Sequence, residues 1–279
     1  MVQTGRHDGR VAIITGASRG IGKAAALRLA AEGASIVVVA KSETSTPEQP
    51  GSIHETAREI EQLGGKALPL RVDVRDDEQV RGMVEAAVEH FGKLDILFNN
   101  AGAIFMRPVI ETPPKRFDLL IDVNVRAAFV ASHYALPHMV RNGWGHILMF
   151  SPELHTGPSP GMAAYMVSKL GMTRIAISIA EEHRADNIAA NALWPVTMIE
   201  TAAVAKNNLG DPSQWRTPEI ICDAVSELFA REPVSCTGRQ VTDEELLREA
   251  GVTNFDHYWV LGKPPEDPIL IAGPTGMMR

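Results

Sequence analysis

Near its amino terminus the chain reads Val11-Ala12-Ile13-Ile14-Thr15-Gly16-Ala17-Ser18-Arg19-Gly20-Ile21-Gly22. The apolar run 11–15 is typical of a buried strand, and the run 21–32, which is followed by Gly33, has the apolar spacing of a helix. The glycine-rich turn between them would bring backbone N–H groups to a helix N-terminus, where a pyrophosphate can bind. An ordinary tight turn could use the same glycines, but its place in the first strand–helix unit favours dinucleotide binding.

Outward from this turn, strand-like apolar runs alternate with helix-like segments. We expect strands at 11–15, 35–40, 66–72, 94–98, 146–150, 188–193 and 238–242. We expect helices at 21–32, 53–63, 78–91, 117–140, 165–183 and 218–230, and a short one at 244–250. This alternation predicts one doubly wound, Rossmann-like α/β domain with a mainly parallel sheet of about seven strands. The domain would span residues 1–243, with 244–279 as a C-terminal extension packed on it.

The composition limits the kinds of binding partner that we expect. The 279 residues are 45% hydrophobic and 22% charged, and the formal net charge is −7, which argues against a general affinity for nucleic acid or anionic membranes. Cys222 and Cys236 lack the spacing of a zinc site or a disulfide framework, so we expect no metal and a reducing compartment. The amino terminus lacks an apolar signal core, and no apolar run approaches the ~20 residues of a membrane span. We therefore expect a cytoplasmic protein that binds small molecules.

Tyr165 and Lys169 lie four residues apart in an expected helix, so both side chains leave from one face. A phenol, whose pKa is ordinarily about 10, transfers protons poorly at neutral pH unless a nearby cation stabilises its anion. A lysine at this spacing can supply that charge. Alone, the pair could equally belong to an amphipathic helix with a solvated lysine.

Five motifs in sequence order change that balance. They are Thr15-Gly16-x-x-x-Gly20-x-Gly22, Asp73 after the third expected strand, Asn99-Asn100-Ala101-Gly102 after the fourth, Asn124 in the long helix, and Tyr165-x-x-x-Lys169. In these motifs the chain resembles the short-chain dehydrogenase/reductase family. Within that family it is most similar to the dehydrogenase part of hydroxysteroid-dehydrogenase-like proteins, through residues 65–69, 72–76, 151–152, 191–195 and 254–256. Some of those proteins carry a further sterol-carrier domain, so the chain is expected to be a catalytic portion.

The resemblance implies hydride transfer between a nicotinamide and a substrate carbon, with Tyr165 as the general acid/base. It implies that Lys169 binds the nicotinamide ribose hydroxyls and that its charge, added to that of oxidised nicotinamide, lowers the pKa of Tyr165. It also implies that Asn124 positions a water molecule that connects Lys169 to solvent. The implied cofactor contacts are Gly16, Ser18, Arg19, Gly20, Ile21, Gly22, Lys41, Asp73, Val74, Asn100, Ala101, Gly102, Tyr165, Lys169, Pro195, Ile199 and Thr201.

Charge at the end of the second expected strand favours NADP over NAD. In this fold an acid at that position binds the adenosine ribose 2′-OH and repels a 2′-phosphate. Here the chain has Ala40-Lys41, and Lys41 with Arg19 could pair with a 2′-phosphate. Both could instead be solvated surface cations.

One position departs from the family pattern. The serine that polarises the substrate oxygen, thirteen residues before the tyrosine, is replaced by Pro152. We expect Ser151 to take its role, with His155 as another possible donor. The proline also leaves open a second class of function, an NADP-binding sensor or scaffold with impaired catalysis.

Apolar candidates for the substrate pocket predict an aldehyde, ketone or secondary alcohol with a hydrophobic body. They are Ile104, Phe105, Leu154, His155, Met162, Trp194 and Met198. Residues 202–218 would form a mobile cover over this crevice. The resemblance implies a homodimer or homotetramer, with an interface at the helices after Phe117 and around Tyr165. The glycine pattern disfavours the epimerases and dehydratases of the extended branch, and the spacing from Tyr165 to Lys169 disfavours enoyl reductases.

Overall fold

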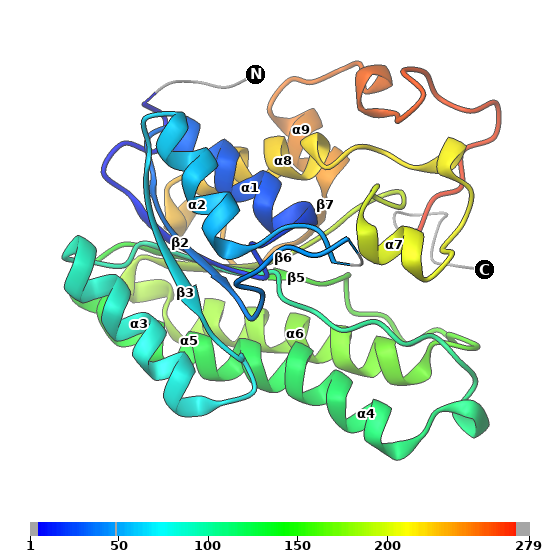
Figure 1. Cartoon of the computed structure of the whole chain (residues 1–279), viewed down its shortest axis with the longest axis horizontal. Helices are drawn as coiled ribbons and strands as arrows, with labels where there is room; N and C mark the ends of the chain where they lie inside the picture. The colour runs from blue at the N-terminus through cyan, green and yellow to red at the C-terminus, as the bar shows by residue number, and fades with distance from the viewer. Residues whose placement is uncertain (1–4, 48, 272–279) are drawn as a thin grey trace.

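Seven parallel strands form one sheet in the computed structural model, which describes residues 5–47 and 49–271. The strand order is β3-β2-β1-β4-β5-β6-β7 (Figure 1). The strands are β1 (Val11–Thr15), β2 (Ser35–Ala40), β3 (Lys66–Arg71), β4 (Ile96–Asn99), β5 (Gly145–Phe150), β6 (Ile188–Trp194) and β7 (Gln240–Thr242). The predicted Rossmann-like fold is therefore confirmed, and each predicted strand lies within two residues of the observed bounds.

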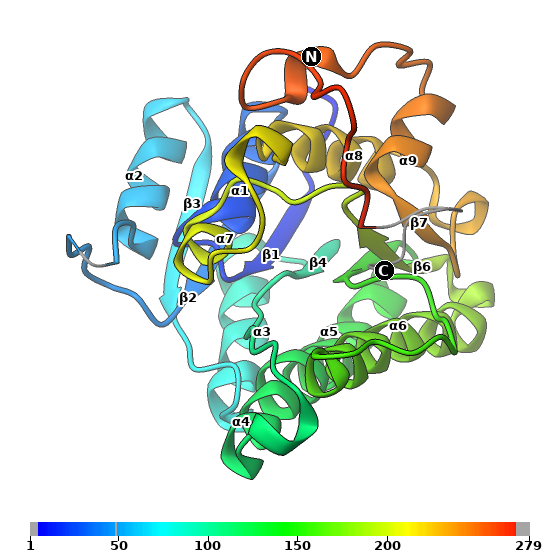
Figure 2. The same cartoon turned by 90° about the vertical axis from the view of Figure 1, so that its right-hand side faces the viewer.

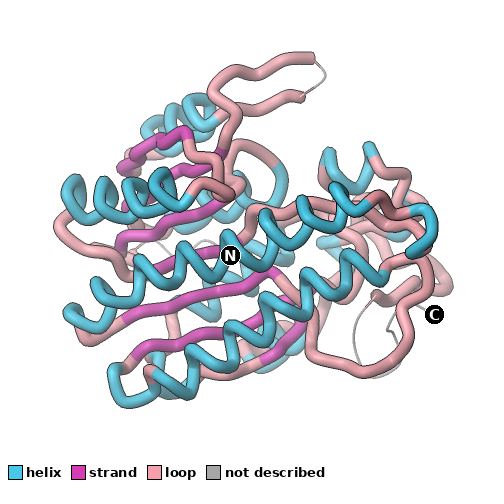
Figure 3. The backbone as a smooth tube through the Cα atoms, turned by 90° about the horizontal axis from the view of Figure 1, so that it is seen from below, coloured by secondary structure: helices cyan, strands magenta, loops and turns pink. Residues whose placement is uncertain are grey.

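Two layers of helices cover the sheet (Figures 1 and 3). The first layer holds α1 (Gly20–Ala31), α2 (Ile53–Gln62), α8 (Glu219–Phe229) and α9 (Asp243–Glu249). The second holds α3 (Asp77–Phe91), α5 (Ala127–Asn142) and α6 (Ala163–Glu182), and α4 (Pro114–Leu120) leads into α5. The short helix α7 (Ala202–Lys206) lies beside the carboxyl ends of the strands.

Alternate residues along each strand pack into the two cores on opposite faces of the sheet, as the pleat of a strand requires. Ile14 and Val38 pack with α1 and α8, whereas Ile13 and Val37 pack with α3, α5 and α6. The strand order reverses next to β1, because β2 lies on one side of it and β4 on the other. In open parallel sheets such a switch point, at the carboxyl ends of the strands, is where ligands bind.

The predicted helix 117–140 is longer than expected and contains a π-helical turn, η2 (Ile121–Arg126), between α4 and α5. Among the described residues, Pro114–Asn142 is the one helix whose length and composition would suit a membrane span. Ala128, Ala131 and Met139 pack in the same core as α3 and α6, as in a core helix of a globular fold. Phe129 is 57% exposed on its outer side, and the self-association predicted there stays a prediction.

The first part of the C-terminal extension contributes side chains to the main core. Helix α9 begins at Asp243, and its Leu246 and Leu247 are buried with α1 and α8. Thr242 and Glu245 form a capping box that starts this helix directly at the end of β7. Residues 272–279 of the predicted extension lie outside the described residues.

Candidate active site

A cavity of about 550 Å³ lies at the carboxyl ends of the strands. Figure 2 faces this side of the molecule, where α4 and α7 lie. All the predicted cofactor contacts line the cavity, from Gly16 in the turn after β1 to Thr201 after β6, and so do Tyr165 and Lys169. The five loops that follow β1, β2, β3, β4 and β6 thus meet around one space.

The glycine turn forms a cradle that leaves little room for a side chain at Gly16 and none at Gly22. Gly16 has φ +71°, and a Cβ there would lie 3.0 Å from the Cα of Ala101. A Cβ on Gly22 would lie 2.5 Å from the carbonyl oxygen of Gly16. Helix α1 begins at Gly20 with no acidic residue in its first turn, and no side chain among the described residues caps it. Its N-terminal N–H groups are therefore suited to a pyrophosphate.

Thr15 and Asn100 join this cradle to the turn after β4. The Thr15 hydroxyl accepts hydrogen bonds from the N–H groups of Asn100, at 3.1 Å, and Ala101, at 3.0 Å. The Asn100 amide donates to the Thr15 carbonyl at 2.8 Å. Polar side chains at these two strand ends are thus used to fix one loop against the other.

The end of the cavity next to β2 carries positive charge. Lys41 and Ser42, the two residues after β2, line the cavity together with Arg19. The Arg19 guanidinium donates to the hydroxyl of Ser42 at 3.0 Å and to the carbonyl of Pro50 at 2.9 Å. Lys41 is well exposed, and its Nζ lies 3.8 Å from a carboxylate oxygen of Asp73. The hydrogen bonds from Arg75 lower the pKa of Asp73 to about 2, so it stays ionised.

Tyr165 and Lys169 lie side by side on α6 and are only 4% and 3% exposed. Lys169 Nζ donates to the Phe150 carbonyl at 2.8 Å and lies 6.0 Å from the centre of the Tyr165 ring. Burial raises the pKa of Tyr165 and lowers the pKa of Lys169 to about 7. In the protein alone, desolvation therefore outweighs the predicted effect of Lys169 on the pKa of Tyr165. A cation brought to the phenol would act in the opposite direction.

Asn124 lies in the π-helical turn, a kind of distortion that often marks functional sites. Its Oδ1 accepts from the Ala103 N–H at 2.8 Å, and its Nδ2 donates to the Ser168 hydroxyl at 2.8 Å. A Cβ on Gly102 would lie 3.4 Å from Asn124 Oδ1 and 3.5 Å from Lys169 Nζ, so both atoms border the same glycine. Asn124 thus ties the turn after β4 to α6, and the predicted water relay stays a prediction.

The position of Ser151 does not support the role predicted for it. Ser151 is 1% exposed, and its hydroxyl lies 2.8 Å from that of Thr173 on α6. The Thr173 hydroxyl also lies 2.6 Å from the Pro152 carbonyl oxygen. Among the described residues that line the cavity, neither Ser151 nor Asn124 occurs. The Ser151 hydroxyl is therefore engaged in a hydrogen bond with another buried side chain.

The pocket candidates divide into three groups. Ile104, Trp194 and Met198 line the cavity. Phe105 and Met162 pack against Tyr165 and Trp194 in a small apolar cluster instead. Leu154 and His155 do not occur among the described lining residues, and no described group bonds the buried ring nitrogens of His155.

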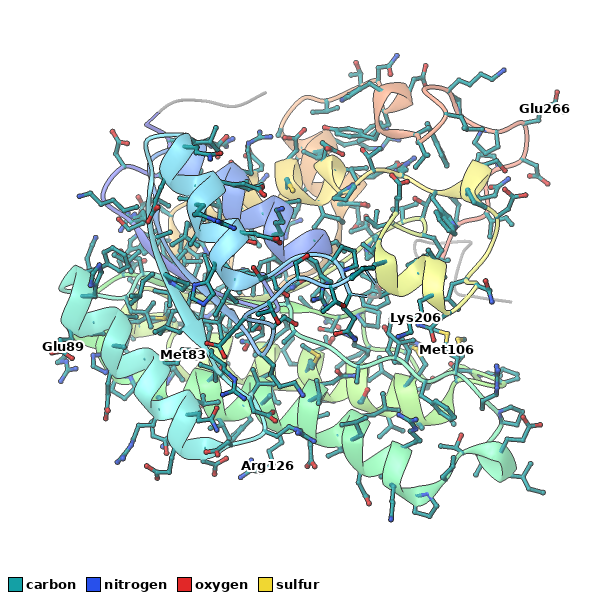
Figure 4. All side chains as sticks on the ribbon, in the orientation of Figure 1. Met83, Glu89, Met106, Arg126, Lys206 and Glu266 are labelled. Atoms are coloured by element: carbon teal, nitrogen blue, oxygen red, sulfur yellow. The ribbon has the colours of Figure 1, made fainter. Side chains whose placement is uncertain are left out.

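Sequence reasoning missed several lining residues, of which Met106 and Ile271 matter most here. Met106, labelled in Figure 4, follows two pocket candidates in the loop after β4, so its apolar neighbours were a usable signal. Ile271 lies far from any motif and gave no signal. Ala202, Ala203 and Val204 of α7 line the cavity, within the predicted cover.

Comparisons with known proteins agree with this geometry. The family model described as short chain dehydrogenase matches residues 10–211. Hydroxysteroid dehydrogenase-like protein 2 of Homo sapiens is 45% identical over 270 residues, which cover 95% of this chain and 64% of that protein. The chain therefore spans somewhat less than two thirds of the length of this relative.

Solved structures extend the comparison. A putative dehydrogenase from Xanthomonas campestris superposes with a TM-score of 0.89 at 39% identity, covering 95% of this chain and 97% of the other. A short chain dehydrogenase from Mycobacterium paratuberculosis bound to NAD gives a TM-score of 0.74 at 29% identity, covering 85% and 97%. By sequence and by fold, the chain belongs to the short-chain dehydrogenase family of oxidoreductases.

Proposed function

We propose that the protein transfers a hydride between NADP(H) and a hydrophobic alcohol or carbonyl substrate, with Tyr165 as the general acid/base. The observation that carries this proposal is that one cavity is lined both by the residues that would bind the cofactor and by the residues that would transfer the proton. The glycine cradle lies at one part of its wall, and the buried pair Tyr165 and Lys169 lies at another.

The residues present fit a nicotinamide dinucleotide. The uncapped N-terminus of α1 and the close approach at Gly16 and Gly22 favour a pyrophosphate, and Asp73 and Asn100 line the adjoining walls. When bound, such a cofactor supplies the hydride donor or acceptor.

Charge supports NADP as the form used. A 2′-phosphate would gain from Lys41 and Arg19, and the residues that directly follow β2 offer no carboxylate to bind a free 2′-OH. The NAD-bound relative is only 29% identical, so its cofactor does not decide the preference here. Lys41→Asp should lower the ratio of kcat/KM for NADPH over NADH by about tenfold or more, about 1.4 kcal/mol. An unchanged ratio, or a wild-type preference for NADH, would refute the assignment.

Tyr165 would give its proton to the carbonyl oxygen in reduction or accept one from the alcohol in oxidation. Lys169, held by the Phe150 carbonyl, would bind ribose hydroxyls and stabilise the phenolate through its charge. Since burial alone raises the pKa of Tyr165, proton transfer depends on positive charge close to the phenol. Apolar side chains at Ile104, Trp194 and Met198 favour substrates with a hydrophobic body.

A second candidate is an NADP-binding sensor without turnover, and the internal hydrogen bond of Ser151 favours it. A screen of NADPH oxidation over hydrophobic ketones and aldehydes separates the two. Wild-type turnover should fall by about 10²- to 10⁴-fold in Tyr165→Phe. The matched control Tyr134→Phe alters a tyrosine that packs against the core formed with α3, α5 and α6, and this variant should keep wild-type activity. Tight NADPH binding with no turnover of any substrate would favour the sensor.

A further inference from the structure

Ile271, the last described residue of the chain, forms part of the cavity wall. Ile271 lines the cavity and is 7% exposed. Its N–H donates to the Val196 carbonyl at 2.7 Å. Val196 lies between Pro195, which lines the cavity, and the turn that carries Met198. The C-terminal extension therefore reaches the side of the cavity formed by the turn after β6.

A small ladder of two isolated β-bridges links this extension to the turn after β6. Arg216 pairs with Ile199 in one bridge and with Trp259 in the other. Arg216 N–H donates to the Met198 carbonyl at 2.9 Å, and Glu200 N–H donates to the Arg216 carbonyl at 2.8 Å. On the outer side, Thr217 N–H donates to the Tyr258 carbonyl at 2.7 Å. The extension thus supports the turn that carries Met198, and the segment 215–217 lies between the two.

Side chains anchor the same ladder. The Trp259 ring lies 4.5 Å from the Arg216 guanidinium carbon, and both residues are 4% exposed. The Tyr258 hydroxyl donates to Asp223 on α8 at 2.5 Å. Further along, Ile269 N–H donates to the Gln214 side-chain oxygen at 2.9 Å. The position of Ile271 is thus set by backbone hydrogen bonds and buried aromatic residues, which a change of its side chain would leave in place.

We propose that Ile271 is a specificity-determining residue that limits the size of the apolar substrate beside Trp194 and Met198. The inference rests on the proposed function and adds to it a residue outside the family model, which ends at residue 211. Its physical basis is steric. A larger side chain on a wall with a fixed backbone takes space from the substrate, and a smaller one returns it.

The test measures kcat/KM for NADPH-dependent reduction of 2-alkanones of increasing chain length. Ile271→Trp should lower the value for the longest ketones by about tenfold or more while the shortest change little, since one methylene in an apolar pocket is worth about 10- to 200-fold. Ile271→Ala should shift the optimum toward longer ketones. The matched control Ile269→Ala alters a 60% exposed residue of the same segment and should keep the wild-type profile. Identical length profiles in all four proteins would overturn the proposal.

A second measurement does not need turnover. The thiol introduced by Ile271→Cys would be alkylated by iodoacetamide through the cavity. Cys222 and Cys236 pack in the core with α1 and α8 and do not occur among the described lining residues, so they should react slowly. NADP together with a long 2-alkanone should slow this alkylation severalfold, but not that of Ile269→Cys. If neither NADP nor the combination protects the thiol, Ile271 is not part of the ligand wall. If protection occurs without turnover by the wild type, the proposed function fails and the wall assignment stands.

Discussion

Removing the buried charge of Lys169 should stabilise the protein when no cofactor is added. Burial lowers the pKa of this amine from 10.5 to about 7. At about 1.4 kcal/mol per pKa unit, the desolvation costs about 5 kcal/mol at or below pH 7. Lys169→Met removes this cost but also the hydrogen bond to the Phe150 carbonyl, worth about 1.5–3 kcal/mol. We therefore expect the variant to gain about 2–3.5 kcal/mol in free energy of unfolding at pH 7.

The gain should depend on pH with a definite sign. Above pH 7 the folded protein releases the Lys169 proton, whereas the unfolded chain holds it to about pH 10.5. The wild type therefore gains stability as the pH rises through this window, and the advantage of Lys169→Met shrinks. Urea denaturation at pH 7 and pH 9.5 measures both values, with the exposed Lys115→Met as the control. A variant no more stable than wild type at pH 7, or an advantage that does not shrink, would refute the reasoning.

Three further substitutions test other features of the structure. Gly22→Ala would place a Cβ 2.5 Å from the Gly16 carbonyl oxygen, so titration by NADPH fluorescence should show cofactor binding lost, and retained affinity would contradict the cradle. Ser151→Ala should leave kcat/KM within about twofold of wild type while the free energy of unfolding falls by about 1–2 kcal/mol; a loss of turnover would restore its predicted catalytic role. Burial raises the pKa of Asp243 from 3.8 to about 7, so the wild type loses stability as the pH rises between these values. Asp243→Asn, which keeps an acceptor for the Val196 N–H, should unfold at higher temperature than wild type at pH 8, and an equal or lower Tm would argue against the buried charge.

The sequence predicted the strands, most helices and the cofactor loops because these follow from local patterns. The apolar run 11–15 matches the bounds of β1. The pattern of Gly16, Gly20 and Gly22 reflects positive φ angles at Gly16 and Gly20 and close contacts at Gly16 and Gly22, both of which favour glycine. Motifs that end parallel strands are brought to one edge by the topology itself. To predict that these motifs meet at one cavity therefore required only the strand order in addition to the motifs themselves.

The rest depends on contacts between distant residues, which single-sequence patterns do not carry. The direction of the Ser151 hydroxyl is set by Thr173, 22 residues further along on α6. Burial raises the pKa of Tyr165 in the protein without cofactor, and the degree of this burial depends on several loops at once. Ile271 reaches the cavity through a hydrogen bond to Val196, which no local motif marks.

The π-helical turn at Ile121–Arg126 couples the register of a core helix to the site. An α-helix advances about 100° per residue, so deleting one residue from this turn would rotate α5 by about that angle relative to α4. Either Asn124 would lose its hydrogen bond from the Ala103 N–H, or the buried face of α5 that includes Ala128 and Ala131 would turn away from the core. The length of this helix is therefore constrained at single-residue resolution, and evolution or design can change its side chains far more freely than its number of residues.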